Sequence, residues 1–578
     1  MKRIIASLFT LFTITAIFAQ GDFRFAVIPD RTGGHRPGIY EDAIRKLNLM
    51  QPEFVMSVGD LIEGYTEDSA EVIRQWEEYD SLIAPLNMPF YYVPGNHDYS
   101  NELMTRIWKE RYGPSYYHFV HKDVLFLCMS SEGEGGQMHG INEKQVAYFS
   151  QVLENHREVR WTLVFMHQPV WTYGDPGWTE LEGILIEREY TVFAGHTHLY
   201  TKYVRNGSRY LVLATAGGIS GLRGTGYGEF DHLTWVTITD SGPVVANLML
   251  DGIRDEEIFT EEQLGLLGLD PLLVKPIFYE DDFREDTVPL EIFNNSPYLL
   301  SATLGTGQST LLEAVAEETE MEIPPGDRAT IHLTLRSTDS HEAIFESEAF
   351  PLHLSYRYSM DKGREVTMQQ QTGLSPVKKL HLRKATRRMK IDGNLREWKE
   401  LPYSVEAPAD GIASFNFSLS SDADYLYLGV EVRDDEFYED PYVSIWEKDA
   451  LLINFDASPV QISANNRKNN IPYHEQPRIY LLPSFEKGTA PRVDQLERLP
   501  EGTLIATART DEGFNLEVAL PVEFIESVGG KEWETIRFNI GYSDIDGEGS
   551  RTIIPWKPNW SDAASYIGSG TFFKAATR

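Results

Sequence analysis

Two histidines one residue apart, His196 and His198, are the side chains in this sequence best placed to hold a metal ion. A short apolar run and a glycine lead into them, in the order Phe193-Ala194-Gly195-His196-Thr197-His198. Similar turns earlier in the chain contain Asp30, Gly59-Asp60, Gly95-Asn96-His97-Asp98 and Met166-His167. Carboxylate, amide oxygen and imidazole are ligands that divalent cations such as Mn²⁺, Zn²⁺, Fe²⁺ and Mg²⁺ accept. The residue types therefore predict a metal site.

Short apolar runs alternate with segments of helical spacing between residues 23 and 193, and this pattern positions the polar turns. Strands are expected at residues 23–28, 54–58, 90–93, 161–165 and 190–193, and helices at 38–50, 70–86, 143–155 and 180–188. A hairpin is expected around Lys122-Asp123. Such alternation predicts a largely parallel, buried sheet. Residues 200–249 have shorter segments and more glycines, which predicts antiparallel strands in a second sheet.

Loops that leave the carboxyl ends of parallel strands meet at one edge of a sheet. Each of the polar turns follows an expected strand, so side chains far apart in the sequence can share one site. Two cations about 3.5–4 Å apart can hold a hydroxide between them and polarise a phosphoryl group. The glycine-rich loop at residues 217–224 can rim such a pocket or serve only as a turn.

The ordered set of turns resembles the signature of the calcineurin-like metallophosphoesterases, over about residues 23–249. The resemblance implies a four-layer αββα sandwich that hydrolyses a phosphate ester with a hydroxide bridging two divalent metal ions. By the same resemblance, Asp60 bridges the metals, Asp30 and His198 complete the first site, and Asn96, His167 and His196 complete the second. His97 would protonate the leaving oxygen as general acid, with Asp98 orienting it.

The first motif departs from this family. Asp-x-His is usual there, whereas this chain has Asp30-Arg31-Thr32, so one imidazole is missing and Thr32 is a weak substitute. Glu63, His35 or water can each replace it; Glu63 would favour Mn²⁺ or Mg²⁺, and His35 would restore the nitrogen count. Arg31 is expected to contact a substrate phosphate, because guanidinium groups match phosphate oxygens and repel cations.

The amino terminus has the order of a secretory signal peptide: Met1-Lys2-Arg3, an apolar stretch at residues 4–17, and a small residue, Ala19, before the expected cleavage. We therefore expect export to the periplasm or the medium. No second apolar run approaches about 20 residues, so no membrane span is expected. A net charge of −35 argues against binding a nucleic-acid backbone. The single cysteine, Cys128, excludes an internal disulfide.

The length of 578 residues predicts roughly three or four domains. Thr260-Glu261-Glu262-Gln263 is a capping-box pattern that predicts a short helix at a domain boundary. Later segments have strand composition with few helices, which favours two all-β sandwich domains. The expected divisions are a signal peptide at 1–19, the phosphoesterase domain at 20–255, a linker helix at 256–270, an immunoglobulin-like sandwich at 271–375 and a last sandwich at 376–578.

The last sandwich resembles the family-nine carbohydrate-binding module in three stretches, which end at Trp398, Asp435 and Asp449. The resemblance implies a β-sandwich that can stack aromatic rings on sugar. Four tryptophans are candidates for this contact, although a tryptophan in a sandwich often packs in the core instead. They are Trp398, Trp446, Trp556 and Trp560.

Together these patterns predict an exported metal-dependent phosphoesterase, whose substrate is a phosphorylated sugar or polymer if the last domain binds glycan. The alternative, from another class, is a carbohydrate-binding surface or scaffold protein with a degenerate phosphoesterase domain. The missing imidazole at Thr32 favours this alternative. The presence of the six predicted metal ligands and of the His97-Asp98 pair favours the enzyme.

Overall fold

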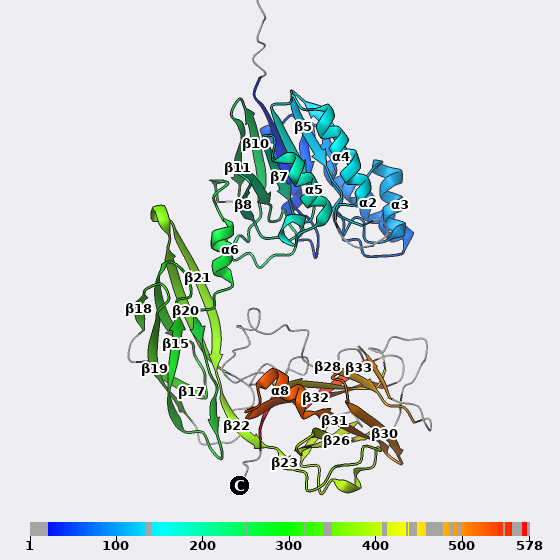
Figure 1. The fold of residues 1–578 in the computed structure, drawn as a ribbon, viewed down its shortest axis with the longest axis vertical. Coiled ribbons are helices and arrows are strands. Elements are labelled where there is room, and N and C mark those ends of the chain that lie inside the picture. Colours follow the sequence, from blue (N-terminus) through cyan, green and yellow to red (C-terminus); the bar gives the residue numbers. More distant parts are fainter. Residues whose placement is uncertain are drawn as a thin grey trace, which may run out of the picture. The chain divides into compact units, whose positions relative to one another are not determined.

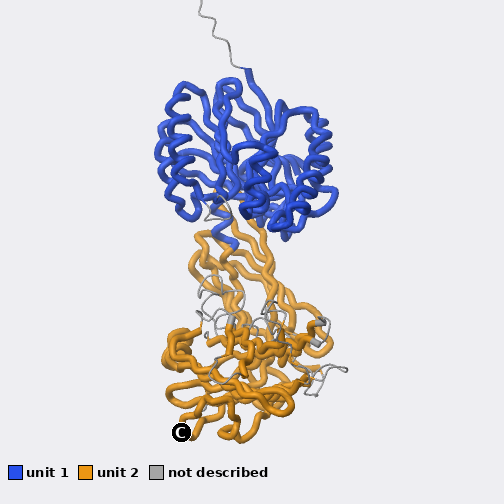
Figure 2. The backbone as a smooth tube through the Cα atoms, turned by 90° about the vertical axis from the view of Figure 1, so that its right-hand side faces the viewer, with its two compact units in different colours: residues 1–267 blue, residues 268–578 orange. Residues whose placement is uncertain are grey.

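A computed structural model of the chain describes residues 21–133, 140–249, 251–316, 319–338, 349–406, 413–434, 437, 448–457, 478–485, 491–494, 499–546, 550–557 and 569–574 (Figure 1). The signal peptide expected at 1–19 lies outside these residues. The chain divides into two compact units, residues 1–267 and 268–578 (Figure 2). Among the described helices, none is long and apolar enough to cross a membrane.

Unit 1 is built on two six-stranded sheets. The first has the strand order β12-β11-β10-β1-β2-β3, in which β1, β2 and β3 are parallel. Its strands are β1 (Phe23–Ile28), β2 (Val55–Ser57), β3 (Phe90–Tyr91), β10 (Leu233–Thr239), β11 (Gly242–Leu248) and β12 (Ile253–Asp255).

The second sheet has the order β4-β5-β6-β7-β9-β8, in which β5, β6, β7 and β9 are parallel. Its strands are β4 (Tyr117–His121), β5 (Val124–Cys128), β6 (Trp161–Phe165), β7 (Tyr190–Ala194), β8 (Thr201–Arg205) and β9 (Ser208–Val212). Lys122 and Asp123 have positive φ angles and form the two-residue turn of the predicted hairpin between β4 and β5.

Helices cover the outer face of each sheet, and a core of aromatic rings fills the space between the sheets. One cluster joins β1 and β2 to α1, α2 and α3, and another joins β5, β6, β7 and β9 to α4 and α5. A third cluster contains phenylalanines from both sheets: Phe25 meets Phe126 edge-on, and Phe126 stacks on Phe165. The predicted four-layer αββα sandwich is confirmed. The helices are α1 (Ile39–Met50), α2 (Ser69–Ile83), α3 (Glu102–Tyr112), α4 (Glu143–Asn155), α5 (Pro176–Leu185) and α6 (Glu261–Leu267).

Two helices of unit 1 differ from the sequence prediction. α3 was not predicted; it begins after Asn101, whose side chain accepts the N–H of Met104. α5 begins at Pro176, earlier than the expected residue 180. The side chain of Asp175 caps it by accepting the N–H of Trp178, so the Gly- and Pro-rich stretch before residue 180 is a helix start.

Unit 2 contains four-stranded sheets with the orders β13-β15-β19-β17 and β18-β16-β20-β21. Alternate side chains along these strands are buried, as expected for an all-β sandwich. The strands are β13 (Leu272–Leu273), β15 (Glu285–Phe293), β16 (Leu299–Thr306), β17 (Leu312–Ala316), β18 (Glu320–Ile323), β19 (Arg328–Ser337), β20 (Phe350–Ser359) and β21 (Glu365–Leu374).

The last part of unit 2 has two larger sheets that enclose one apolar core. One contains β23 (Arg383–Lys384), β24 (Tyr403–Glu406), β25 (Ser414–Ser421), β26 (Tyr425–Arg433), β30 (Leu504–Thr510) and β31 (Gly513–Pro521). The other contains β14 (Ile277–Tyr279), β22 (Pro376–His381), β27 (Ala450–Asp456), β28 (Arg478–Leu482), β29 (Arg492–Asp494), β32 (Thr535–Asp546), β33 (Ser550–Pro555) and β34 (Gly570–Phe573). Helix α8 (Val522–Gly529) follows β31. Although β14 lies within residues 271–375, it pairs with β22 in this sheet.

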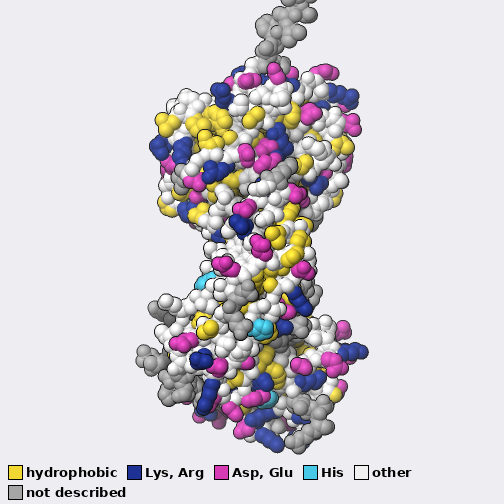
Figure 3. All heavy atoms as spheres, turned by 90° about the vertical axis from the view of Figure 1, so that its left-hand side faces the viewer, with side chains coloured by type: hydrophobic (Ala, Val, Ile, Leu, Met, Phe, Trp, Pro, Cys, Tyr) yellow, Lys and Arg dark blue, Asp and Glu magenta, His cyan; other side chains and the backbone are white. Residues whose placement is uncertain are grey.

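The surface carries both signs of charge despite the strongly acidic sequence. On the face drawn in Figure 3, Asp and Glu side chains alternate with Lys and Arg side chains over both units. The fold therefore shows no broad cationic surface on that face, in agreement with the net charge of −35.

Candidate metal centre

The six predicted ligands lie where strands of the two sheets of unit 1 end. Asp30 follows β1, Asp60 follows β2, Asn96 follows β3, His167 follows β6, and His196 and His198 follow β7. The structure brings all six together at the carboxyl edge of the two sheets, as the predicted parallel strands require.

Two glycines allow these turns to approach one another. A Cβ atom on Gly95 would lie 2.2 Å from Oδ1 of Asp60, and a Cβ atom on Gly195 would lie 2.1 Å from Oδ1 of Asp30. Any larger residue would therefore displace a carboxylate.

Three of the ligand candidates have backbone angles that are unusual for residues other than glycine. The φ angles are 56° at Asp60, 74° at His196 and 54° at His198. Such left-handed conformations are uncommon and gather at functional sites, where the surrounding structure holds them.

Four donor atoms converge around the side chain of Asn96. Its Oδ1 lies 2.8 Å from Nε2 of His167 and 2.8 Å from Nδ1 of His196. These two ring nitrogens are 3.2 Å apart, and Oδ2 of Asp60 is 3.3 Å from Nε2 of His167. Two nitrogens and two oxygens thus face a common point, which suits a borderline divalent cation.

Asp30, Asp60 and His198 form the second group, in which one ligand atom from each lies within 4.8 Å of the others. Oδ2 of Asp30 accepts the N–H of His196 at 2.6 Å and is 3.3 Å from Nε2 of His198. Oδ1 of Asp30 is buried and has no hydrogen-bond partner in the described part of the chain. A buried carboxylate oxygen without a donor fits a bound cation.

Backbone carbonyls set the orientation of two of the imidazoles. Nδ1 of His167 lies 2.8 Å from the carbonyl oxygen of Val58, and Nδ1 of His198 lies 2.6 Å from that of Ile219. Each Nδ1–H donates to its carbonyl, so each Nε2 is left as the ligand atom.

The electrostatics of the cluster favour a positive charge in its interior. Burial alone would raise the pKa of Asp60, but the imidazoles of His167 and His97 outweigh it and lower that pKa to about 2. Burial likewise opposes charge on His167, yet Asp60 raises its pKa to about 10. The residues present therefore fit a cation.

His97 lines the pocket beside this cluster. Its Nδ1 lies 2.6 Å from the carbonyl oxygen of Glu63, and its backbone N–H donates to Oδ1 of Asp60 at 3.0 Å. Asp98 was expected to orient His97, but its carboxylate accepts the N–H groups of Leu61, Ile62 and Gly95. The backbone carbonyl of Glu63 therefore orients the ring of His97, whereas Asp98 holds the loop that carries His97.

Arg31 and Thr32 have partners inside the protein. Arg31 is only 5 % exposed; its guanidinium donates to the carbonyl of Leu61 at 3.1 Å and to Glu78 at 2.5 Å. The structure therefore does not place Arg31 with the pocket residues, contrary to its expected contact with a substrate phosphate. The hydroxyl of Thr32 is buried and donates to the backbone carbonyl of Asp60 at 3.1 Å.

Glu63 and His35, the expected replacements for the missing imidazole, bind each other. Glu63 accepts the N–H groups of Gly34 and His35 at 3.0 and 2.9 Å, and its Oε1 lies 2.7 Å from Nδ1 of His35. The structure therefore brings neither side chain into the ligand cluster. The group of Asp30, Asp60 and His198 has one protein ligand fewer than the group around Asn96.

The pocket over the cluster has a volume of about 410 Å³ and includes residues of the glycine-rich loop 217–224, which the sequence offered as a rim. Tyr65 was not predicted: its hydroxyl accepts the amide of Asn96 at 2.8 Å, and its ring lies edge-on to His97 at 4.8 Å. Because Tyr65 stands in a loop without a motif, no sequence signal could have found it.

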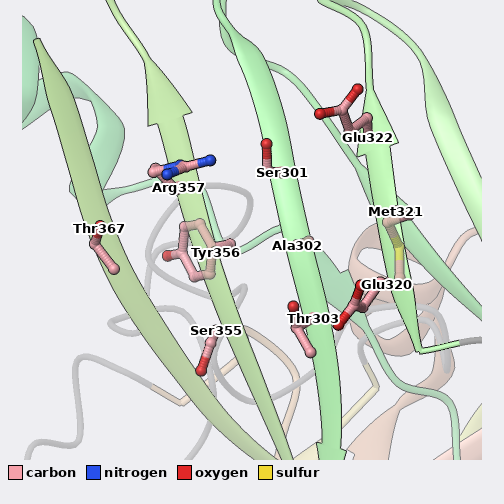
Figure 4. A pocket seen from close by; sticks show the side chains of 10 residues that line it. All are labelled: Ser301, Ala302, Thr303, Glu320, Met321, Glu322, Ser355, Tyr356, Arg357 and Thr367. Atoms are coloured by element: carbon pink, nitrogen blue, oxygen red, sulfur yellow. The ribbon is translucent and has the colours of Figure 1, made fainter.

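A larger hollow, of about 630 Å³, lies over the outer face of β16, β18, β20 and β21 (Figure 4). Its lining includes hydroxyls and charged groups, among them Ser301, Thr303, Glu322 and Arg357. Among the described residues, no cluster of metal-type ligands falls in this domain, where the sequence predicted no catalytic group.

Three carboxylates also approach one another in the last domain. Asp434, Asp449 and Asp544 place one oxygen each within 4.8 Å of the others. Asp434 accepts the hydroxyl of Tyr542, and Asp449 accepts the N–H of Ile545 at 2.7 Å. The sequence did not predict this group, because its members are far apart in the chain: Asp434 follows β26, Asp449 precedes β27 and Asp544 lies within β32.

Two of the four tryptophans proposed for sugar contact are packed against the domain. Nε1 of Trp398 donates to Glu517 at 3.0 Å, and a Cβ atom on Gly429 would lie 2.5 Å from its ring. The ring of Trp556 is partly buried, lies 4.9 Å from that of Phe417 and packs against the core. Trp446 and Trp560 lie outside the described residues.

Comparison with known families supports both resemblances, that of the amino-terminal domain to phosphoesterases and that of the last domain to carbohydrate-binding modules. Residues 23–200 match the calcineurin-like phosphoesterase family, and residues 391–570 match the family described as carbohydrate family 9 binding domain-like. A curated relative, the probable glycerophosphodiester phosphodiesterase GpdQ of Arcobacter nitrofigilis, is 22 % identical over 125 residues. The match covers 21 % of this chain and 42 % of that relative, less than half its length.

Two solved structures show weak overall similarity. A dimetal phosphatase from Danio rerio is 13 % identical with a TM-score of 0.33, covering 40 % of this chain and 98 % of that one. A family 9 carbohydrate-binding module from Caldicellulosiruptor kristjanssonii, in complex with cellotriose, is 13 % identical with a TM-score of 0.26, covering 35 % and 95 %. From the two family matches, the chain carries a calcineurin-like phosphoesterase domain at residues 23–200 and a family 9 carbohydrate-binding-like domain at residues 391–570.

Proposed function

We propose that the protein is a metal-dependent phosphoesterase that holds two divalent cations. The observation that carries the proposal is the convergence of donor atoms around Asn96, whose Oδ1 is 2.8 Å from a ring nitrogen of both His167 and His196. Asp60 approaches this group and also the group of Asp30 and His198, so it is the residue able to bridge two ions.

The chemistry is hydrolysis of a phosphate ester. When bound, the cations supply Lewis acidity that polarises the phosphoryl group and activates water. The oxygen of water bonds to phosphorus while the bond to the leaving alcohol breaks. Nδ1 of His97 is tied to the carbonyl of Glu63, so Nε2 is the ring atom that can give a proton to the leaving oxygen.

The test is hydrolysis of generic phosphate esters with Mn²⁺, Zn²⁺ or Mg²⁺. Asn96→Ala and His196→Ala should each reduce kcat/KM by at least about a hundredfold, because each removes a ligand. Asn87→Ala and His156→Ala, which change the same residue types outside the cluster, should retain wild-type activity. Equal activity in the wild type and both ligand variants would refute the proposal.

The second candidate function is a carbohydrate-binding scaffold with an inactive phosphoesterase domain. The buried Thr32 hydroxyl in place of an imidazole, together with the family 9 match, favours it. Metal content separates the two: about two ions per chain at saturation support the enzyme, and none supports the scaffold.

Export and a glycan-linked substrate extend the proposal. The basic residues at positions 2–3 and the apolar stretch 4–17 support export. Amino-terminal sequencing of the mature protein should then begin after Ala19, and an intact Met1 in the exported protein would contradict cleavage. Phosphorylated oligosaccharides are the first substrates to assay if the last domain binds glycan.

A further inference from the structure

The described lining of the pocket over the metal centre contains no Lys or Arg side chain. Its described lining consists of ligand candidates, His97, Gly33, Thr197, Leu199, the loop segment from Ile219 to Gly221, and Glu229, and it includes no Lys or Arg. Residues 134–139, the one gap within 21–249, contain no Lys or Arg in the sequence either. Within the described part of this domain, a bound phosphate would therefore meet no Lys or Arg, and positive charge would come from the cations and from protonated His97.

The arginines on neighbouring segments are all paired with acids. Arg31 is bound to Glu78, and Arg36 makes two 2.7 Å bonds to the carboxylate of Asp231. Arg223 is bound to Glu229, the one additional acid of the pocket lining, at 2.9 and 2.5 Å. Each of these guanidinium groups is already neutralised by a carboxylate. None is therefore available to bind the second negative charge of a phosphate monoester.

A further carboxylate lies close to the cluster. Glu132 is buried and accepts both 3.0 Å bonds from the amide of Gln168, next to His167. A monoester dianion would bring two negative charges into these acidic surroundings, whereas a diester brings one.

Apolar side chains border the same pocket at two places. Ile219 is 63 % exposed, and its carbonyl holds His198. Tyr65 is 61 % exposed and contacts Asn96 and His97. Exposed apolar groups beside a polar site mark the place where a ligand buries its own apolar part.

We propose that this site binds and cleaves phosphate diesters in preference to monoesters, with the second substituent lying against Ile219 and Tyr65. This inference rests on the proposed phosphoesterase function. Water adds to phosphorus, one ester bond breaks, and the products are an alcohol and a monoester. The monoester dianion finds no Lys or Arg in the described lining to retain it and leaves, so a separate phosphomonoesterase must consume it.

Binding of uncleavable analogues tests the preference without turnover. Diphenylphosphinate carries one charge and two substituents, and phenylphosphonate carries two charges and one substituent. By calorimetry on the metal-loaded full chain, diphenylphosphinate should bind at least about tenfold more tightly, and Ile219→Ala should weaken it about fivefold. Ile73→Ala, which changes an exposed isoleucine on α2, should leave both affinities unchanged. Equal or tighter binding of phenylphosphonate would overturn the inference.

Hydrolysis separates failure of this inference from failure of the proposed function. The ratio of kcat/KM for bis(p-nitrophenyl) phosphate over p-nitrophenyl phosphate should exceed about ten. Faster hydrolysis of the monoester overturns the diester preference and leaves the phosphoesterase proposal standing. Hydrolysis of neither ester by the metal-loaded protein overturns both.

Discussion

The imidazole of His97 is held by the backbone carbonyl of Glu63, 2.6 Å from its Nδ1, and the neighbouring carboxylate of Asp98 holds the loop instead. Because Nδ1 is occupied, only Nε2 is available for proton transfer. Burial and the nearby charge of Asp60 raise the pKa of Asp98 to about 8. The orientation of the proposed acid thus depends on the path of the backbone from Asp60 to Gly64.

His97→Gln should reduce activity in proportion to how much the leaving group needs a proton. For an alkyl phosphate ester the expected loss in kcat is about a hundredfold to ten-thousandfold, because an alkoxide leaves poorly without an acid. For a p-nitrophenyl ester the loss should be within about tenfold, and metal content should stay at the wild-type value. The two kcat ratios are the measurement, and equal losses for both esters would exclude His97 as the acid.

Glu63→Ala and His35→Ala should leave the number of bound metal ions unchanged. The carboxylate of Glu63 is used by the N–H groups of Gly34 and His35 and by Nδ1 of His35, and neither side chain belongs to the ligand cluster. Loss of these contacts should lower the free energy of unfolding by about 1–2 kcal/mol. Elemental analysis after metal loading is the measurement; loss of one ion in either variant would show that it is a ligand.

Three of the strand ends that form the metal centre could be predicted from the sequence. Strand ends followed by Gly59-Asp60, Gly95-Asn96 and Gly195-His196 could be found, because short apolar runs mark strands and parallel strands share an edge. The alternation predicted a parallel, buried sheet, and the four-layer fold followed from the resemblance of the ordered turns to the calcineurin-like family.

Other contacts could not be predicted. The bond from His198 to the carbonyl of Ile219 is a backbone contact between loops, and it leaves no signature in residue type. The salt bridge of Arg31 with Glu78 depends on how helix α2 packs against the first sheet. Both depend on three-dimensional packing, which local periodicity does not specify.

Protonation of His232 should destabilise unit 1 in mild acid. This ring is buried; its Nε2 accepts the N–H of Ala214 at 3.1 Å, and burial lowers its pKa to about 4 despite Asn247 and Asp231. Because the unfolded value is about 6.5, the contribution is complete above pH 6.5 and is lost as the pH falls toward 4, by up to about 3 kcal/mol. The free energies of unfolding in urea of the wild type and of His232→Gln should therefore become equal as the pH falls toward 4. Parallel pH curves would contradict this.

Trp398→Ala should lower the stability of the last domain by roughly 3 kcal/mol, because the ring packs on Gly429 and donates to Glu517. Lys399→Ala, an exposed neighbouring change, should have no effect within about 0.5 kcal/mol. Urea unfolding and calorimetry with a cello-oligosaccharide give the two readouts. Unchanged stability together with lost sugar binding would make Trp398 a sugar platform and not a packing residue.

Anomalous scattering from a crystal soaked in Mn²⁺ tests the central claim most directly. We expect two peaks, one bounded by Asp60, Asn96, His167 and His196, and a second bounded by Asp30, Asp60 and His198. The second should need a higher Mn²⁺ concentration to fill, because it has one protein ligand fewer. An absence of peaks among these six side chains at saturating Mn²⁺ would contradict the assignment of a metallophosphoesterase centre.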